Sequence, residues 1–260
     1  MKIGFFDSGL GGLLVLKAVA KMLPEYDYEF YGDTANLPYG DKTESEIFEL
    51  TKSGVLHLFQ KDCVLVIIAC NTASAATTRR LQDELLKLEY SDRKILGVII
   101  PTVEVVIASS LERVLLIGTN RTINSGKYAT EFGRHVDAPN LISTATPELV
   151  PQIEDGRLES ALQGVLAVVQ ANEGVDGLIL GCTHYAILKH KITEQLLGKK
   201  IQIFSQDEII PAKLKTYLEN HPEIVRLLTR GGERNIHLTD NSSRYDSVIQ
   251  ELLGGAFIAD

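Results

Sequence analysis

Short apolar runs alternate with longer amphipathic stretches along most of the chain. Apolar runs of about four to eight residues between turn residues are typical of buried strands, and apolar residues three and four positions apart are typical of helices. We predict strands at 2–6, 28–33, 64–69, 95–100, 114–120, 177–182, 201–204 and 235–240. We predict helices at 12–23, 43–60, 72–88, 102–110, 123–135, 156–172, 207–219 and 243–253. This alternation indicates an α/β fold with parallel sheets.

Two of the predicted strands end in a cysteine that small polar residues follow. Cys70 comes after 64–69, and Cys182 ends 177–182. Asp7 precedes Cys70 by 63 positions, and Thr119 precedes Cys182 by 63. Equal spacing is expected of a duplicated unit but also arises by coincidence. If the chain is duplicated, two similar lobes face each other, and both cysteines lie at carboxyl strand ends, where ligands bind in such sheets.

Composition limits the partners that the protein can have. The 260-residue chain is 45% hydrophobic and 23% charged, as in ordinary folded proteins. Its net charge of −8 disfavours nucleic acid and anionic membranes as main partners. The first residues lack a secretory signal, and no uncharged apolar run approaches the roughly 20 residues of a membrane helix. We therefore expect a cytoplasmic protein that binds neither nucleic acid nor membranes.

The three cysteines, an odd number, argue against a disulfide framework. A cysteine between a strand end and a helix start lies near the positive end of the helix dipole, which lowers the pKa of a thiol and makes it a usable base. Cys63 is not followed by polar residues and is expected only to pack in the core. Cys70 and Cys182, each followed by two hydrogen-bonding residues, are candidates for chemistry.

Zinc and nucleophilic catalysis are the alternatives for Cys182, because His184 is two residues away. There is no C-x-x-C pair and no further histidine at ligand spacing, so we expect no metal. A single nucleophilic cysteine paired with His184 would leave Cys70 unexplained.

The glycine-rich opening, DSGLGG, is not a dinucleotide fingerprint, because Leu14 stands where the pattern requires glycine. Asp7 and Ser8 remain as a carboxylate that can receive an ammonium group and a hydroxyl that can donate or accept. The alternative is a turn in which Asp7 bonds its own backbone. In LPYGDK, a turn by its Pro and Gly, the backbone of Tyr39 and Gly40 could approach a ligand.

Together these groups suit a zwitterionic amino acid. Such a ligand needs an acceptor for its ammonium group and several donors for its carboxylates. Inversion at Cα needs one group on each face, and two thiols from opposing lobes would supply them, one as base and the other as acid. Thr119 and Thr122 are further donors in the second lobe.

The motifs in this order resemble the cofactor-independent glutamate racemases of bacterial cell-wall synthesis. The matching segments are IGFFDSGLGG, YGDTANLPYG, ACNTAS, GTNRT and LGCTHY. The resemblance implies two α/β lobes with parallel sheets, pseudo-two-fold symmetry and an active site in the cleft between them. It divides the chain into 1–97 plus 206–260 and 98–205, with crossings near Gly97 and Ser205. It also implies interconversion of L- and D-glutamate without cofactor or metal, and a homodimer that supplies D-glutamate for peptidoglycan.

The same resemblance implies roles for individual residues. Cys70 is expected to act as base toward D-glutamate and Cys182 toward L-glutamate, with assistance from Asp7 and His184. Glu154 matches a further acidic position. The residues expected to line the substrate are Asp7, Ser8, Tyr39, Gly40, Asn71, Thr72, Thr183 and His184.

The chain departs from the family pattern at several positions outside this set. Ala186 stands where proline is usual, Ile100 and Thr102 where a glutamate and a glycine are common, and Gln206 where glycine is usual. These differences concern lobe packing and regulation more than chemistry. Two other functions remain open: a decarboxylase or cis–trans isomerase on the same scaffold, and a binding or regulatory protein that uses the cleft or its acidic surface.

Overall fold

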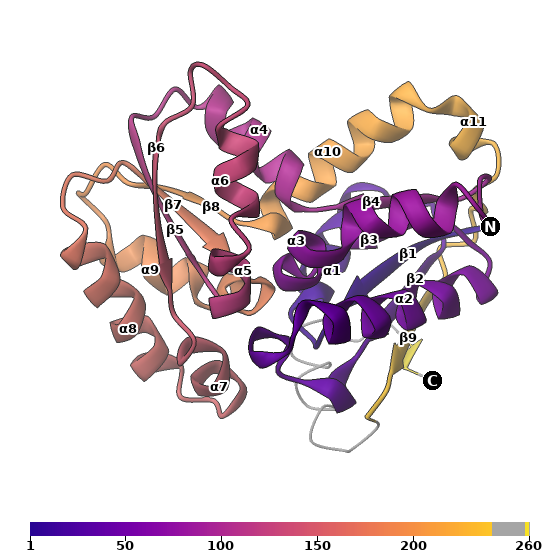
Figure 1. Cartoon of the computed structure of the whole chain (residues 1–260), viewed down its shortest axis with the longest axis horizontal. Coiled ribbons are helices and arrows are strands. Elements are labelled where there is room, and N and C mark those ends of the chain that lie inside the picture. The colour runs from indigo at the N-terminus through magenta and orange to yellow at the C-terminus, as the bar shows by residue number, and fades with distance from the viewer. Residues whose placement is uncertain (241–257, 260) are drawn as a thin grey trace.

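The computed structural model describes residues 1–240 and the backbone of residues 258 and 259. Two parallel sheets lie side by side, each with helices on both faces, and the two ends of the chain lie in the same lobe (Figure 1). This confirms the predicted α/β fold. Among the described residues, no helix combines the length and the apolar character needed to cross a membrane.

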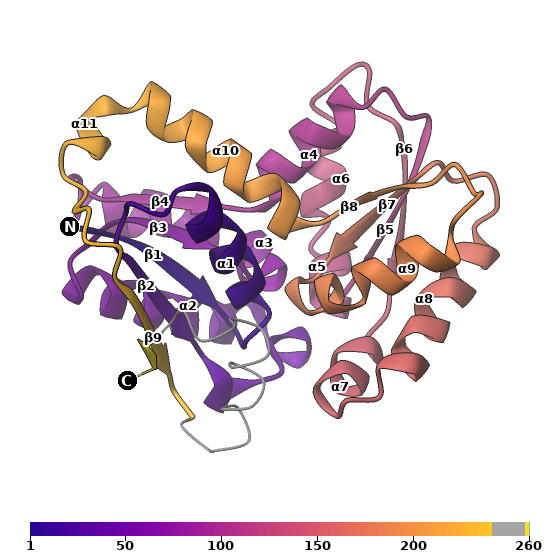
Figure 2. The same cartoon turned by 180° about the vertical axis from the view of Figure 1, so that it is seen from behind.

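The first sheet has the strand order β10-β9-β2-β1-β3-β4. Its strands are β1 Lys2–Asp7, β2 Tyr28–Gly32, β3 Cys63–Ile68, β4 Lys94–Gly97, β9 Arg234–Leu238 and β10 Ile258–Ala259. Its main helices are α1 Gly12–Met22, α2 Glu44–Gln60, α3 Asn71–Leu81 and α10 Gln206–Asn220, with the short α11 Pro222–Val225 after α10. Helices α1 and α10 pack together, as do α2 and α3 (Figure 2). The adjacent residues Phe5 and Phe6 belong to cores on opposite faces, so both faces of this sheet are buried.

The second sheet has the order β6-β5-β7-β8. Its strands are β5 Arg113–Gly118, β6 Asn140–Ala145, β7 Gly177–Gly181 and β8 Gln202–Phe204. Its helices are α4 Ile99–Ala108, α5 Asn120–Asn124, α6 Lys127–Phe132, α7 Leu149–Glu154, α8 Leu158–Ala171 and α9 Lys189–Gln195. Leu115 and Leu116 point into different cores, so this sheet too is covered on both faces.

The strand order confirms the internal repeat, because β2-β1-β3-β4 recurs as β6-β5-β7-β8. The residue equivalence differs by one from the equal spacing in the sequence. Phe6 lies beside Ile68, and Ile117 lies beside Leu180. Ile68 and Leu180 are each two residues before a cysteine, so the counterpart of Thr119 is Ser8 rather than Asp7. The division of the chain at 97/98 and 205/206 stays a prediction.

Three predicted elements differ in the structure, and one strand was missed. The apolar run at 95–100 is not one strand: β4 ends at Gly97, and α4 begins at Ile99. The helix at 123–135 is interrupted by Gly126, whose φ of +64° leaves the helical region. The helix at 72–88 ends in a π-helical turn, Gln82–Leu86. Strand β6 was not predicted, since no residue of this edge strand is buried and its apolar pattern is weak. The helix at 243–253 lies outside the described residues.

Candidate active site

A pocket lies where the carboxyl ends of β1, β3, β5 and β7 approach one another. It encloses about 580 Å³, including its part open to solvent. Nine of the ten predicted site residues line it: Ser8, Tyr39, Gly40, Cys70, Asn71, Thr72, Cys182, Thr183 and His184. The tenth, Asp7, is fully buried beside it and accepts a hydrogen bond from Thr183. Residues far apart in the sequence therefore share one site between the lobes.

Cys70 is the N-cap of α3, as its place after β3 predicted. Its Sγ accepts the backbone N–H of Ala73 at 3.5 Å and lies 3.2 Å from the Ser8 hydroxyl. Burial and the nearby Asp7 carboxylate nevertheless raise the pKa of Cys70 to about 12, because they outweigh these two hydrogen bonds. The expectation that the helix start lowers the pKa of this thiol is therefore wrong. Desolvation is the larger effect.

Cys182 follows β7 and begins a 3₁₀ helix, Thr183–Leu188. Its Sγ lies 3.8 Å from Nδ1 of His184, and Nε2 of that imidazole lies 3.2 Å from Oε1 of Glu154. Burial alone would lower the pKa of His184, but its hydrogen bonds to Cys182 and Glu154 outweigh burial and raise this pKa well above its ordinary value. These contacts therefore stabilise the protonated form of the imidazole next to Cys182, with the Glu154 carboxylate on its other side.

The sequence left two interpretations of Asp7: a carboxylate at the ligand site, or a residue that bonds the backbone of its own turn. The structure is consistent with both. Its Oδ2 accepts the backbone N–H of Gly9 at 3.1 Å, as in a self-bonded turn, and its Oδ1 accepts the Thr183 hydroxyl of the other lobe at 3.3 Å. Burial raises the pKa of Asp7 and outweighs the attraction of His184. Burial thus disfavours the carboxylate form of Asp7, while His184 and the hydrogen bonds from Gly9 and Thr183 favour it.

The segment of Tyr39 and Gly40 is held by a residue that the sequence analysis missed. The Tyr39 hydroxyl donates to Oδ2 of buried Asp33 at 2.6 Å, and Thr239 donates to Oδ1 at 3.0 Å. A Cβ on Gly40 would lie 3.2 Å from Cβ of Thr119, so this segment touches the second lobe. Asp33 follows β2 within the motif YGD, a polar residue at a strand end, and that signal could have identified it.

Threonine hydroxyls join the lobes at the pocket wall. Thr72 in α3 lies 2.9 Å from Thr119 and 3.0 Å from Thr122, and these two are 3.0 Å apart. Thr119 also lines the pocket. This triangle places several neutral donors where the sequence expected them.

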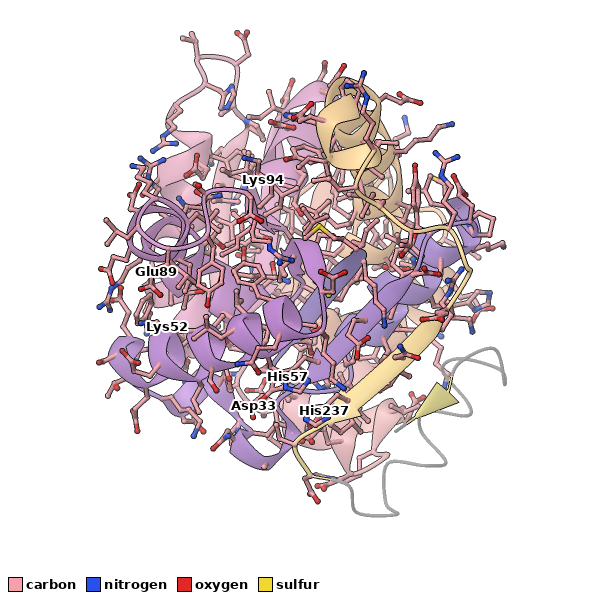
Figure 3. All side chains as sticks on the ribbon, turned by 90° about the vertical axis from the view of Figure 1, so that its right-hand side faces the viewer. Asp33, Lys52, His57, Glu89, Lys94 and His237 are labelled. Atoms are coloured by element: carbon pink, nitrogen blue, oxygen red, sulfur yellow. The ribbon has the colours of Figure 1, made fainter. Side chains whose placement is uncertain are left out.

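The remaining cysteine and two of the other histidines serve packing. Cys63 is buried next to Gly4, and burial raises the pKa of its thiol. His57 and His237 stack with ring centroids 4.4 Å apart and lie next to each other in Figure 3. In the part of the chain that the structure describes, no three His, Cys, Asp or Glu residues are grouped as a metal site.

Comparison with known proteins agrees with this geometry. A model of the Asp/Glu/hydantoin racemase family matches residues 14–208. The chain belongs to this family. The resemblance that the motifs indicated is therefore confirmed, and the paired cysteines of this family member end equivalent strands of its two lobes.

Individual relatives extend the match to nearly the whole chain. A glutamate racemase from Ruegeria pomeroyi is 36% identical over 86% of this chain and 87% of its own. The structure of glutamate racemase isoform RacE1 from Bacillus anthracis superposes with a TM-score of 0.88 at 28% identity, covering 100% of this chain and 96% of that one. The glutamate racemase from Francisella tularensis in complex with D-glutamate gives 0.85 at 28% identity, covering 99% and 95%.

Proposed function

We propose that the protein is a glutamate racemase that interconverts L- and D-glutamate by a two-base mechanism without a cofactor. The observation that carries this proposal is the pair of thiols, Cys70 and Cys182, which end equivalent strands and line one pocket. A pseudo-two-fold site can offer one thiol to each face of Cα. The named relatives favour glutamate as the substrate.

In this mechanism Cys70 takes the Cα proton from D-glutamate and Cys182 takes it from L-glutamate, while the opposite thiol returns a proton. The pKa of Cys70, about 12, makes its thiolate a strong base once it forms. The substrate ammonium group brings a positive charge next to Asp7 and Cys70, which favours their ionised forms. Exclusion of water keeps the thiolate reactive toward a weak carbon acid.

The other lining residues bind the substrate in this proposal. Ser8, Asn71, Thr72 and Thr183 carry hydrogen-bonding side chains in the pocket, and Tyr39 and Gly40 bring backbone groups to it. Donors aimed at the α-carboxylate stabilise the negative charge that develops when Cα loses its proton. His184, backed by Glu154, assists proton transfer at Cys182.

Three further statements belong to the proposal. The D-glutamate serves peptidoglycan synthesis, the protein acts in the cytoplasm, and it forms a homodimer. Analytical ultracentrifugation of the purified protein tests the last: a single species of one chain's mass, 28.6 kDa, at micromolar concentration would contradict it.

Incubation with L-glutamate in D2O, without added cofactor, tests the function. NMR follows the Cα–H signal while polarimetry follows optical activity. Loss of both is expected, because abstraction on one face and return of deuterium on the other exchanges and inverts Cα together. Persistence of both signals for glutamate would overturn the proposal, and the same assay with aspartate then shows whether the substrate or the whole reaction was wrong. A decarboxylase would instead release CO2, and a binding protein would retain its ligand affinity after Cys70→Ser and Cys182→Ser.

A further inference from the structure

A chain of buried hydrogen bonds lies where the backbone passes between the lobes. Nδ2 of Asn71 donates to Oε1 of Gln206 at 3.1 Å, and the Tyr128 hydroxyl donates to Oδ1 of Asn71 at 2.7 Å. The Thr102 side chain also interacts with the Tyr128 hydroxyl. All four side chains are at least 98% buried. Thr102 lies in the first turn of α4, and Gln206 begins α10. These hydrogen bonds therefore join the starts of the two helices that follow the backbone connections between the lobes.

These contacts determine the polarity of the Asn71 amide. A side-chain amide has an oxygen that only accepts and a nitrogen that only donates, and the two ends have nearly the same shape. The Tyr128 proton goes to the oxygen of Asn71, and Gln206 accepts one of the two hydrogens on the nitrogen. The second hydrogen on Nδ2 remains for the pocket that Asn71 lines beside Cys70.

A contribution to the stability of the folded protein does not by itself explain why glutamine stands at position 206. Its Nε2 is buried and has no hydrogen-bond partner among the described residues. A buried amide nitrogen without a partner destabilises the folded state, and an apolar side chain of similar size would avoid this loss. The contact that its side chain does make is the acceptance of the Asn71 hydrogen.

We infer that Tyr128 and Gln206 are positioning residues that hold the nitrogen of Asn71 toward the pocket, where it donates to a carboxylate of the substrate. This inference rests on the proposed racemase function. A carboxylate only accepts hydrogen bonds, so a reversed amide would set oxygen against oxygen. The donor gains importance as Cα loses its proton, because negative charge then moves onto the α-carboxylate.

The test uses Tyr128→Phe and Gln206→Met, each made in the unmodified protein and in the Asn71→Ala variant. Racemisation kinetics with L-glutamate and calorimetric binding of D-glutamate are measured for all. Each substitution should lower kcat/KM and weaken binding by about tenfold in the unmodified protein, as expected when a hydrogen bond to a charged group is impaired. In the Asn71→Ala variant neither should have a further effect, because both act through Asn71.

Tyr28→Phe is the matched control, since Tyr28 is also buried and its hydroxyl donates to the Leu23 carbonyl at 2.7 Å, away from the pocket. It should lower the thermal midpoint but leave kcat/KM unchanged. If Tyr128→Phe and Gln206→Met act equally with and without Asn71, or leave kcat/KM unchanged where Asn71→Ala lowers it, the inference is overturned. If one of these two variants does not fold, the other still shows whether its effect depends on Asn71. An unmodified protein that neither racemises nor binds glutamate would overturn the proposed function, and the inference with it.

Discussion

Cys70 and Cys182 end equivalent strands of two similar sheets, yet their surroundings differ. Cys70 caps an α-helix and meets a hydroxyl and a backbone N–H, both neutral. Cys182 begins a 3₁₀ helix and meets the imidazole of His184, which Glu154 holds from behind. The two sheets thus share their strand order, while the helical turns after the cysteines and the side chains that contact the two sulfur atoms differ.

This difference arises because the equivalent side chains of the two lobes make different contacts at the start of the helical turn. In the first lobe, Ser8 from the neighbouring strand end reaches Cys70. Its counterpart, Thr119, instead bonds to Thr72 and Thr122. Cys70 is therefore contacted by neutral hydrogen-bonding groups, whereas Cys182 is contacted by an imidazole whose protonated form is stabilised. The two directions of racemisation are nearly mirror images of each other, but the side chains that contact the two thiols do not have to be.

The largest effect is expected from removing either thiol. Cys70→Ser and Cys182→Ser should each lower racemisation by about a thousandfold or more, because a serine hydroxyl is a far weaker base. Exchange of the Cα hydrogen without inversion should survive selectively. The Cys70 variant should exchange L-glutamate and the Cys182 variant D-glutamate, as NMR in D2O would show.

Cys63→Ser is the control for this pair, since Cys63 is buried away from the pocket. Full activity in either site variant, or exchange of the same enantiomer by both, would contradict the assignment of one thiol to each face.

The next largest effect is expected from Gly11→Ala. A Cβ at Gly11 would lie 2.5 Å from Oγ1 of Thr183 and 2.8 Å from the backbone nitrogen of His184, so this segment beside Cys182 must move. We expect kcat/KM to fall by about a hundredfold, since misplacement by about 1 Å is enough for such a loss. Gly133→Ala, whose Cβ would meet no atom closer than 3.3 Å, is the control and should retain activity. Equal activity of the two variants would show that the Cys182 side tolerates displacement.

Glu154→Gln should lower kcat/KM by about tenfold and change its pH dependence. Because the Glu154 carboxylate helps to raise the pKa of His184, its removal should move the alkaline limb of the kcat/KM profile to lower pH. A raised histidine pKa contributes stability fully below the unfolded value of about 6.5 and loses it as pH rises through the folded value. The deficit in unfolding free energy of this variant should therefore be largest just below pH 6.5 and shrink in alkali, as urea titrations would show.

Glu159→Gln, a change at an exposed residue of α8, is the control for this prediction. An unchanged alkaline limb in the Glu154 variant would mean that Glu154 does not govern the protonation of His184.

The smallest effect is expected on the Cys70 side. Ser8→Ala removes the hydroxyl 3.2 Å from Sγ, which should raise the pKa of Cys70 further and lower kcat/KM by about threefold to fivefold. Alkylation of Cys70 by iodoacetamide, followed by peptide mass spectrometry, should slow in parallel. If Ser8→Ala costs more activity than Glu154→Gln, the neutral partner matters more than the charged one, and the comparison between the two thiols is reversed.

Much of this site was predictable from local sequence. Strands buried on both faces give uninterrupted apolar runs such as 64–69 and 177–182, and polar residues directly after them must lie at the ligand-binding edge. That reasoning, with the family motifs, identified the nine residues that line the pocket and the adjacent Asp7.

The contacts within the site could not be predicted, even for Glu154, whose position the family motifs had already indicated. Glu154 reaches His184 from α7, and Tyr128 reaches Asn71 from α6, both across long stretches of chain. The direction of the Cys70 pKa shift also needed the structure, because burial and a helix start act in opposite directions and only geometry decides between them. Strand β6 was missed because an exposed edge strand lacks the apolar alternation on which prediction relies.

The position of β9 has a consequence for synthesis on the ribosome. Strand β9 pairs with β2 across about two hundred residues, and every strand of the second sheet lies between them in sequence. The second sheet can be assembled once residue 204 has left the exit tunnel, but β9 can join the first sheet only after residue 238 has left it, and β10 later still. During that interval the β2 edge offers unpaired backbone groups to any partner. The lobe that is translated first is therefore the one completed last.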